Sequence, residues 1–235
     1  MQHTLPALVF DLDGTLADTA GDLHLVLQEV LAEVDLPAPP LQAVRGMIGD
    51  GAKVLIERAL AEIGHVPAPG FVDERFARFR VRYAQVPCRA SRLYPGAAAL
   101  LRTLRERGHR LGLCTNKPQA ATDGLLAALG IDDHFTAVIG GDATLAKKPD
   151  SAHLAAVLEA MDATPAAAVM IGDSRNDLLT ARALGVPCIL VSFGYTNVPA
   201  RHLGADAVVD RLDEIPGALA ALRREQLRCH GSVEA

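Results

Sequence analysis

Short apolar segments alternate with longer amphipathic ones along most of the chain. Six mainly apolar runs have the length of buried strands, at residues 5–10, 110–114, 137–140, 168–171, 188–191 and 207–209. Such runs are typical of parallel strands covered on both faces. Between the later runs, helices are predicted at residues 95–107, 119–129, 151–160 and 175–184. The alternation predicts an α/β fold with a doubly wound, Rossmann-like parallel sheet.

One long segment after the first predicted strand breaks this alternation. It contains no strand-like run, and its pattern predicts helices at residues 20–34, 51–63 and 71–84. A right-handed crossover between parallel strands needs only one helix. We therefore expect a small helical domain at residues 17–88, inserted into a discontinuous α/β core that is formed by residues 1–16 and 89–235. The polar tail from residue 223 is predicted to be frayed.

Composition and charge narrow the classes of function. Half of the 235 residues are hydrophobic and 22% are charged, which disfavours disorder over most of the length. The net charge of −5, without a long basic stripe, disfavours a general binder of nucleic acid or of anionic membranes. We see no signal-peptide pattern and no bilayer-spanning apolar run, and the four cysteines form no CxxC pair. These features predict reduced thiols and a cytoplasmic location.

Two acidic residues follow the first predicted strand, in the segment Asp11-Leu12-Asp13-Gly14-Thr15. In open α/β sheets, ligands bind at the carboxyl ends of the strands. Two neighbouring carboxylates at such a place repel each other and attract a cation. Gly14 allows a tight turn whose backbone amides can meet an anion. The alternative interpretation of this segment is an ordinary Asp-Gly turn.

Three later strand ends carry further polar groups. Thr115 and Asn116 offer a hydroxyl and an amide that suit phosphate oxygens, and Lys148 stands out in a chain that is poor in lysine. Asp173 and Asp177 lie one helical turn apart at the start of a predicted helix. Each pattern alone also fits a loop or a helix cap. Together with the first acid pair they predict a site with hard oxygen ligands for Mg²⁺, a cation for a phosphoryl group and a carboxylate nucleophile.

The four motifs, taken in chain order, resemble those of the phosphatase branch of the haloacid dehalogenase (HAD) superfamily. The resemblance covers nearly the whole chain, and the inserted helices look like the helical cap of that family. The matching motifs are Asp11-Leu12-Asp13-Gly14-Thr15, Thr115-Asn116, Lys148-Pro149 and Gly172-Asp173-Ser174-Arg175-Asn176-Asp177. The resemblance implies a Mg²⁺-dependent phosphomonoester hydrolase that works through an aspartyl-phosphate intermediate.

The resemblance also implies a catalytic group and a set of metal ligands. Asp11 would be the nucleophile, and Asp13 would protonate the leaving oxygen and then activate water. Lys148 would bind the phosphoryl oxygens and keep Asp11 ionised. Magnesium would be held by Asp11, by Asp173 and by the backbone carbonyl of Asp13, with Asp177 orienting or completing the metal shell.

Phosphate binding and substrate selection are implied for a second set of residues. Thr115, Asn116 and the backbone near Gly14 would meet the phosphoryl oxygens. Within the branch, the segment at residues 45–60 is most similar to the cap of phosphoglycolate phosphatases, which implies hydrolysis of 2-phosphoglycolate to glycolate and phosphate. In that segment Arg45 would grip the glycolate carboxylate, and Gly49 would let a cap loop approach the substrate. A solvated surface arginine is the alternative for Arg45.

Other functions on the same fold stay open at this stage. The motifs of the core do not separate a phosphoglycolate phosphatase from another HAD-type small-molecule phosphatase, a phosphomutase or a pyrophosphatase, because specificity lies in the cap. A binding protein without turnover is a remoter alternative, since such a protein would be expected to lack Asp11, Asp13 or Lys148. The expected partner is a small phosphorylated metabolite, with no nucleic acid and no membrane, and the expected assembly is a monomer or a homodimer.

Overall fold

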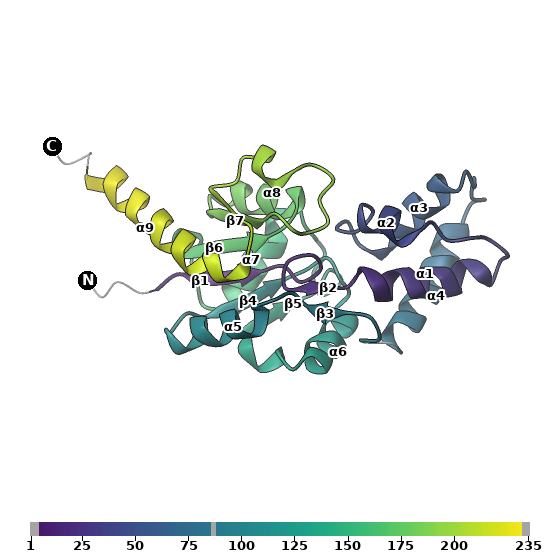
Figure 1. The fold of residues 1–235 in the computed structure, drawn as a ribbon, viewed down its shortest axis with the longest axis horizontal. Helices are drawn as coiled ribbons and strands as arrows, with labels where there is room; N and C mark the ends of the chain where they lie inside the picture. The colour runs from purple at the N-terminus through teal and green to yellow at the C-terminus, as the bar shows by residue number, and fades with distance from the viewer. Residues whose placement is uncertain (1–4, 86–87, 232–235) are drawn as a thin grey trace.

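A six-stranded parallel sheet forms the centre of the molecule (Figure 1). The structure, a computed structural model, describes residues 5–85 and 88–231, with side chains up to residue 224. The strands follow the order β5-β4-β1-β6-β7-β8. Their bounds are Ala7–Phe10 (β1), Leu111–Cys114 (β4), Ala137–Ile139 (β5), Ala168–Gly172 (β6), Cys188–Val191 (β7) and Ala207–Val209 (β8). All six predicted strands and the α/β fold class are confirmed.

Helices cover both faces of this sheet, as a doubly wound fold requires. Alternation along β1 places Leu8 and Phe10 in one core cluster, together with leucines of α5, α6 and α9. Ala7 and Val9 face the opposite cluster, which contains the apolar side chains of α7 and α8. The bounds of these helices are Ala97–Glu106 (α5), Gln119–Leu129 (α6), Ser151–Ala160 (α7), Arg175–Ala183 (α8) and Ile215–Gly231 (α9). The prediction that the tail frays from residue 223 to residue 235 is wrong up to Gly231, where α9 ends, and its last four residues lie outside the described part of the chain.

The strand order decides where a ligand can bind. The chain runs from β1 through β4 to β5 on one side, and then returns to β6, on the other side of β1. Phe10, the last residue of β1, lies opposite Leu113 of β4 and Ile171 of β6. The segments that follow these three parallel strands therefore leave the sheet at the same edge. A strand order that reverses in this way opens a crevice at the carboxyl ends of the strands.

Among the described residues of the segment 19–91 there are four helices, which have a core of their own. They are α1 (Ala20–Ala32), α2 (Leu41–Arg45), α3 (Ala52–Glu62) and α4 (Phe71–Ala84). Figure 1 shows them at one end of the molecule, opposite α9. Their core includes Leu27, Ile56, Leu60 and Phe79, which are 1% exposed or less. The three predicted helices are present, and the five-residue α2 adds to them. The division into a cap and a core at the predicted boundaries stays a prediction.

Remaining short elements join these larger parts. The two-residue strands β2 (Ala17–Asp18) and β3 (Arg92–Leu93) pair in antiparallel fashion, so the chain enters and leaves the helical segment at one place. Short 3-10 helices lie at Asp132–His134 (η1), Pro165–Ala167 (η2), Ala200–His202 (η3) and Leu212–Glu214 (η4). Within the described part of the chain, no helix has the length and apolar character needed to cross a bilayer.

A buried carboxylate ties α1 to the strand that leaves the helical segment. The Asp22 side chain is fully buried and accepts hydrogen bonds from the backbone amides of Ala90 (2.7 Å) and Ser91 (2.9 Å) and from the Ser91 hydroxyl (2.5 Å). These bonds hold the two connections to the helical segment next to each other. A buried acceptor with three donors is costly to remove, because every donor is then left without a partner.

We predict that Asp22→Ala lowers the free energy of unfolding by about 2–4 kcal/mol, because two buried donors of Ser91 and the partly buried amide of Ala90 lose their acceptor. Urea unfolding followed by circular dichroism measures this change. The matched control is Glu62→Ala on α3, whose side chain is exposed; it should alter stability by less than about 0.5 kcal/mol. Equal effects of the two substitutions would contradict the structural role of Asp22.

Candidate active site

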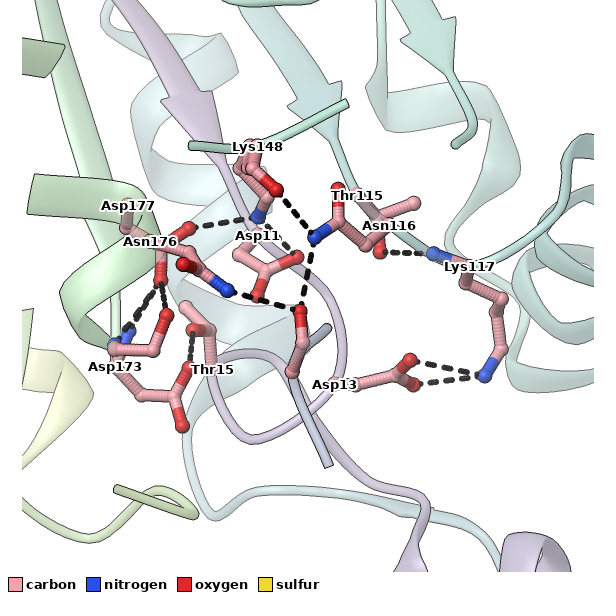
Figure 2. A network of polar contacts seen from close by, with 12 residues as sticks. Asp11, Asp13, Thr15, Thr115, Asn116, Lys117, Lys148, Asp173, Asn176 and Asp177 are labelled. Carbon is pink, nitrogen blue, oxygen red and sulfur yellow. Dashed lines mark hydrogen bonds and ion pairs between the residues drawn. The ribbon is translucent and has the colours of Figure 1, made fainter. Parts of the chain in front are cut away.

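Three carboxylates gather at the carboxyl edge of the sheet (Figure 2). Asp11 follows β1, Asp173 follows β6, and Asp177 lies in the first turn of α8. One oxygen of each lies within 4.8 Å of the others, and the three residues are at most 7% exposed. The sequence predicted that the two acid pairs lie close together, and the structure brings together these three of the four side chains. We call them the acidic cluster.

Backbone and hydroxyl donors fix two members of the acidic cluster. Asp173 accepts a hydrogen bond from the Tyr195 amide at 2.7 Å, and Asp177 accepts one from the Ser174 hydroxyl at 2.7 Å. Asp177 also accepts from the Ser174 amide, which completes a capping box at the start of α8. Helix capping and the acidic cluster therefore use the same residues, and the two interpretations of this motif do not exclude each other.

Lys148 is the cation of this cluster. Its ammonium lies 2.8 Å from Asp11 Oδ1 and 2.7 Å from Asp177 Oδ1, and its side chain is 2% exposed. Burial by itself would lower the pKa of Lys148, but the two carboxylates outweigh it and raise the pKa above its ordinary value. Lys148 therefore stays charged and can attract phosphoryl oxygens.

One lysine does not balance three carboxylates. Burial raises the pKa of Asp11 to about 6 from an ordinary value of 3.8, against the opposing effect of Lys148. Burial also raises the pKa of Asp173 well above its ordinary value, and the charges of Asp177 and Asp11 add to this effect. The cluster thus holds more negative charge than it can stabilise alone. Oxygen ligands with a surplus of negative charge suit a hard divalent cation such as Mg²⁺.

Asp13, the second acid of the first motif, points elsewhere. Its carboxylate lies 2.9 Å and 3.1 Å from the ammonium of Lys117 and accepts a hydrogen bond from the Thr19 hydroxyl at 2.7 Å. Figure 2 shows this pair to one side of Asp11 and Lys148. Lys117 was not among the predicted site residues. A signal was present, because Lys117 directly follows Thr115-Asn116 in a chain with few lysines.

The predicted phosphate-binding residues border the acidic cluster. Thr115 is 1% exposed, and its hydroxyl accepts a hydrogen bond from the Lys117 amide at 3.3 Å. The side-chain amide of Asn116 donates hydrogen bonds to the backbone carbonyls of Gly49 (2.9 Å) and Lys148 (3.0 Å), so it holds these two backbone segments in place. Gly14 has a φ of +87°, and a Cβ there would lie 2.4 Å from Asp173 Oδ2. This position therefore needs glycine for both conformation and space.

The two residues predicted for substrate selection lie in different surroundings. The Gly49 carbonyl accepts hydrogen bonds from Asn116 (2.9 Å) and Asn176 (3.3 Å), which bring the loop before α3 over the strand ends. Arg45 donates to Asp18 at 2.7 Å, and its guanidinium lies 5.6 Å from the centre of the Tyr195 ring. Arg45 is thus occupied by a carboxylate of this chain. Its predicted role in gripping substrate stays a prediction.

A cavity of about 400 Å³ opens between the strand ends and the helical segment. Asp11, Asp13, Thr115 and Lys117 line it on the side of the sheet, whereas Arg45 lies outside its lining. The opposite wall is mostly apolar and comes from the helical segment, with Leu23, Ile48, Gly49, Leu55, Phe79 and Tyr83. The cavity is therefore polar at the predicted reaction centre and apolar elsewhere, as is usual for a site that binds a small molecule.

Comparison with known proteins agrees with this geometry. The sequence profile described as "Haloacid dehalogenase-like hydrolase" matches residues 8–191. The chain belongs to the haloacid dehalogenase-like hydrolases. A phosphoglycolate phosphatase from Rhodospirillum rubrum is 44% identical over 208 residues, which cover 87% of this chain and 86% of that protein. Relatives of the same name at 37% to 42% identity cover at least 91% of this chain. As a member of this family with these relatives, the chain is a phosphatase.

Solved structures share the fold over nearly the whole chain. A predicted phosphoglycolate phosphatase from Haemophilus somnus has a TM-score of 0.84 and 29% identity, with 92% of this chain and 99% of that chain covered. A mutant of CbbY from Rhodobacter sphaeroides in complex with xylulose-(1,5)bisphosphate has a TM-score of 0.76 and 26% identity, with 90% of this chain and 96% of that chain covered.

We predict that the charge of Asp11 lowers stability in metal-free protein. The pKa of Asp11 is raised to about 6, so the folded protein binds this proton more tightly than the unfolded chain does. The stability of wild type relative to Asp11→Asn should therefore be greatest below pH 3.8 and fall by up to about 3 kcal/mol as the pH rises through 6. Denaturant unfolding of both proteins in EDTA, at several pH values, measures this difference. A difference that does not change with pH would contradict the raised pKa.

Proposed function

We propose that this phosphatase hydrolyses small phosphomonoesters with Mg²⁺ and through an aspartyl-phosphate, and that 2-phosphoglycolate is its substrate. The observation that carries the proposal is the buried Asp11 carboxylate 2.8 Å from the Lys148 ammonium, in a cavity that also contains Asp13 and Thr115. A carboxylate next to a fixed cation is suited to attack phosphorus, because the cation attracts the phosphoryl oxygens to the nucleophile.

The roles of the residues follow from their places. Asp11 attacks phosphorus and forms the aspartyl-phosphate, while Lys148 and Thr115 bind the phosphoryl oxygens. Asp13 gives a proton to the leaving oxygen and then takes one from the water that hydrolyses the intermediate. For this step the Asp13 carboxyl turns from Lys117, its partner at 2.9 Å, toward the leaving group. The amides near Gly14 and Asn116 surround the phosphoryl group.

The acidic cluster fits a divalent metal, since three buried carboxylates with oxygens within 4.8 Å share a single lysine. Asp11, Asp173 and the Asp13 carbonyl would hold Mg²⁺, and Asp177 would orient the shell while it also holds Lys148. A bound Mg²⁺ would offset the charge of a phosphate dianion and draw electrons from phosphorus.

The helical segment serves in this proposal as the cap, at residues 17–88. Its apolar side chains form the far wall of the cavity, and the Gly49 loop contacts the core through Asn116 and Asn176. Opening about the paired connections β2 and β3 would admit substrate, and closure would exclude bulk water from the aspartyl-phosphate. The cytoplasmic location and an assembly as monomer or homodimer stay predictions.

The substrate assignment draws on the relatives that are named phosphoglycolate phosphatase, one of them 44% identical over 208 residues. A sugar bisphosphate is the second candidate, because the CbbY mutant of similar fold is in complex with xylulose-(1,5)bisphosphate. Both molecules carry a phosphate ester and a second anionic group. The apolar wall of the cavity leaves few polar groups for the hydroxyls of a larger sugar bisphosphate, which favours the smaller ester.

The test is release of phosphate from 2-phosphoglycolate, compared with sugar phosphates, nucleotides and pyrophosphate. We expect kcat/KM for 2-phosphoglycolate to exceed the others at least about tenfold, and EDTA to remove activity until Mg²⁺ is restored. Asp11→Asn should lower kcat roughly a thousandfold or more, because it removes the nucleophile.

Other outcomes of this panel would each reject one part of the proposal. Preference for a sugar phosphate would overturn the substrate assignment and leave the chemistry intact. Full activity in EDTA would reject the requirement for Mg²⁺. Full activity of the Asp11→Asn variant would reject Asp11 as the nucleophile. Absence of turnover with every ester would favour a protein that only binds its ligand.

A further inference from the structure

Two buried polar groups of the cavity are not used by the proposed chemistry. One is the hydroxyl of Tyr83, on the last turn of α4, and the other is the ammonium of Lys117, in the loop after β4. The Lys117 ammonium lies 4.7 Å from the centre of the Tyr83 ring. The helical segment and the sheet therefore each supply one of these groups to the same end of the cavity.

The Tyr83 hydroxyl has the Lys117 ammonium as a polar neighbour but no described acceptor for its own proton. Tyr83 is 4% exposed, and among the described residues its oxygen has no hydrogen-bond partner of acceptable geometry. Burial raises the pKa of Tyr83 to about 12, so the phenol keeps its proton and can donate it in a hydrogen bond. Buried hydroxyls in folded proteins nearly always have a partner. Tyr83 lines the cavity and its hydroxyl donates to no described residue, so its proton is available to a ligand bound there.

Lys117 supplies a positive charge that is paired with Asp13, the proposed catalytic acid. Its side chain is 2% exposed, and its ion pair in the described structure is with Asp13. When Asp13 turns to the leaving oxygen, the Lys117 ammonium loses that counter-charge inside a buried site. Because an unpaired buried charge is costly, an anionic group of the substrate is favoured in its place.

Arg80 is the other candidate cation, since it also lines the cavity. Its side chain is 55% exposed, and its guanidinium lies 3.6 Å from the Asp142 carboxylate. Solvent screens a charge at such a position, and Asp142 does not take part in the proposed reaction. The pairing of Arg80 thus persists through the reaction, whereas that of Lys117 does not.

We propose that Lys117 and Tyr83 form the subsite for the carboxylate of the substrate, so that they select phosphomonoesters with a carboxylate one carbon from the ester oxygen. This inference rests on the proposed function and specifies its substrate class. The ammonium pairs with one carboxylate oxygen, and the phenol donates a hydrogen bond to the carboxylate. The substrate carboxylate then replaces Asp13 as the ion-pair partner of Lys117. Binding of the substrate therefore frees the Asp13 carboxyl to act as the catalytic acid.

The experiment compares two esters that differ only at this group. Ethyl phosphate has a methyl group where 2-phosphoglycolate has its carboxylate. We expect Tyr83→Phe and Lys117→Met each to lower the ratio of kcat/KM for 2-phosphoglycolate to that for ethyl phosphate by at least about tenfold. Tyr83→Phe is the cleaner variant, because it removes the hydroxyl and leaves the ion pair of Lys117 with Asp13 in place.

A matched control is Tyr94→Phe. The Tyr94 hydroxyl also lacks a hydrogen-bond partner among the described residues, and Tyr94 lies outside the lining of the cavity. The ratio should be the same in this variant as in wild type. A ratio that is unchanged in both Tyr83→Phe and Lys117→Met would overturn the subsite. A ratio that falls only in Arg80→Gln would overturn it as well, since the carboxylate would then bind at Arg80.

Lys117 could also affect turnover by positioning Asp13. The two esters distinguish this effect from binding of the substrate carboxylate. If Lys117→Met slows both esters by the same factor, Lys117 only positions Asp13 and the subsite is rejected. Calorimetric binding of both esters, measured in an Asp11→Asn background, repeats the comparison without turnover. If Tyr83→Phe weakens the binding of 2-phosphoglycolate but not that of ethyl phosphate, the subsite is supported. This holds even if wild type hydrolyses neither ester, because absence of hydrolysis rejects only the proposed reaction.

Discussion

The ammonium of Lys148 among buried carboxylates is the interaction on which the rest of the site depends. It lies within 2.8 Å of both Asp11 and Asp177, so it joins the end of β1 to the first turn of α8. Without it, three buried carboxylates would repel one another. With it, negative charge still exceeds positive charge, and such a surplus on oxygen ligands suits a divalent cation. Burial, with a smaller contribution from the charge of Asp177, raises the pKa of Asp11 to about 6 in spite of Lys148.

Close packing at the edge of the sheet makes this charge arrangement possible. A Cβ at Gly172 would lie 2.2 Å from Asp177 Cγ, and one at Gly194 would lie 2.2 Å from Asp173 Cβ. Together with Gly14, these positions let backbone pass directly beside the carboxylates. The core therefore holds the reacting groups rigidly, while the helical segment covers them through a few contacts of the Gly49 loop.

The sequence predicted the sheet and the acidic cluster because both follow from short-range patterns. Apolar runs mark the strands, and parallel order brings their ends together. It missed β2 and β3, since two residues carry no periodicity. It also predicted no helix at Ile215–Gly231 and a frayed tail from residue 223, because the polar residues there hid a helix that packs on one side. It did not pair Lys117 with Asp13 or Arg45 with Asp18. Such contacts depend on side-chain directions across segments far apart in sequence, which spacing does not encode.

The central claim is that Asp11 forms a covalent bond to phosphorus, so that hydrolysis takes place in two displacements. Stereochemistry tests it most directly. A phosphorothioate ester made chiral at phosphorus with two oxygen isotopes is hydrolysed with Mg²⁺ in water that carries the third isotope, and the configuration of the released thiophosphate is determined. Two in-line displacements, first by Asp11 and then by water, predict retention of configuration. Inversion would mean that water attacks the ester directly, and it would contradict the role given to Asp11.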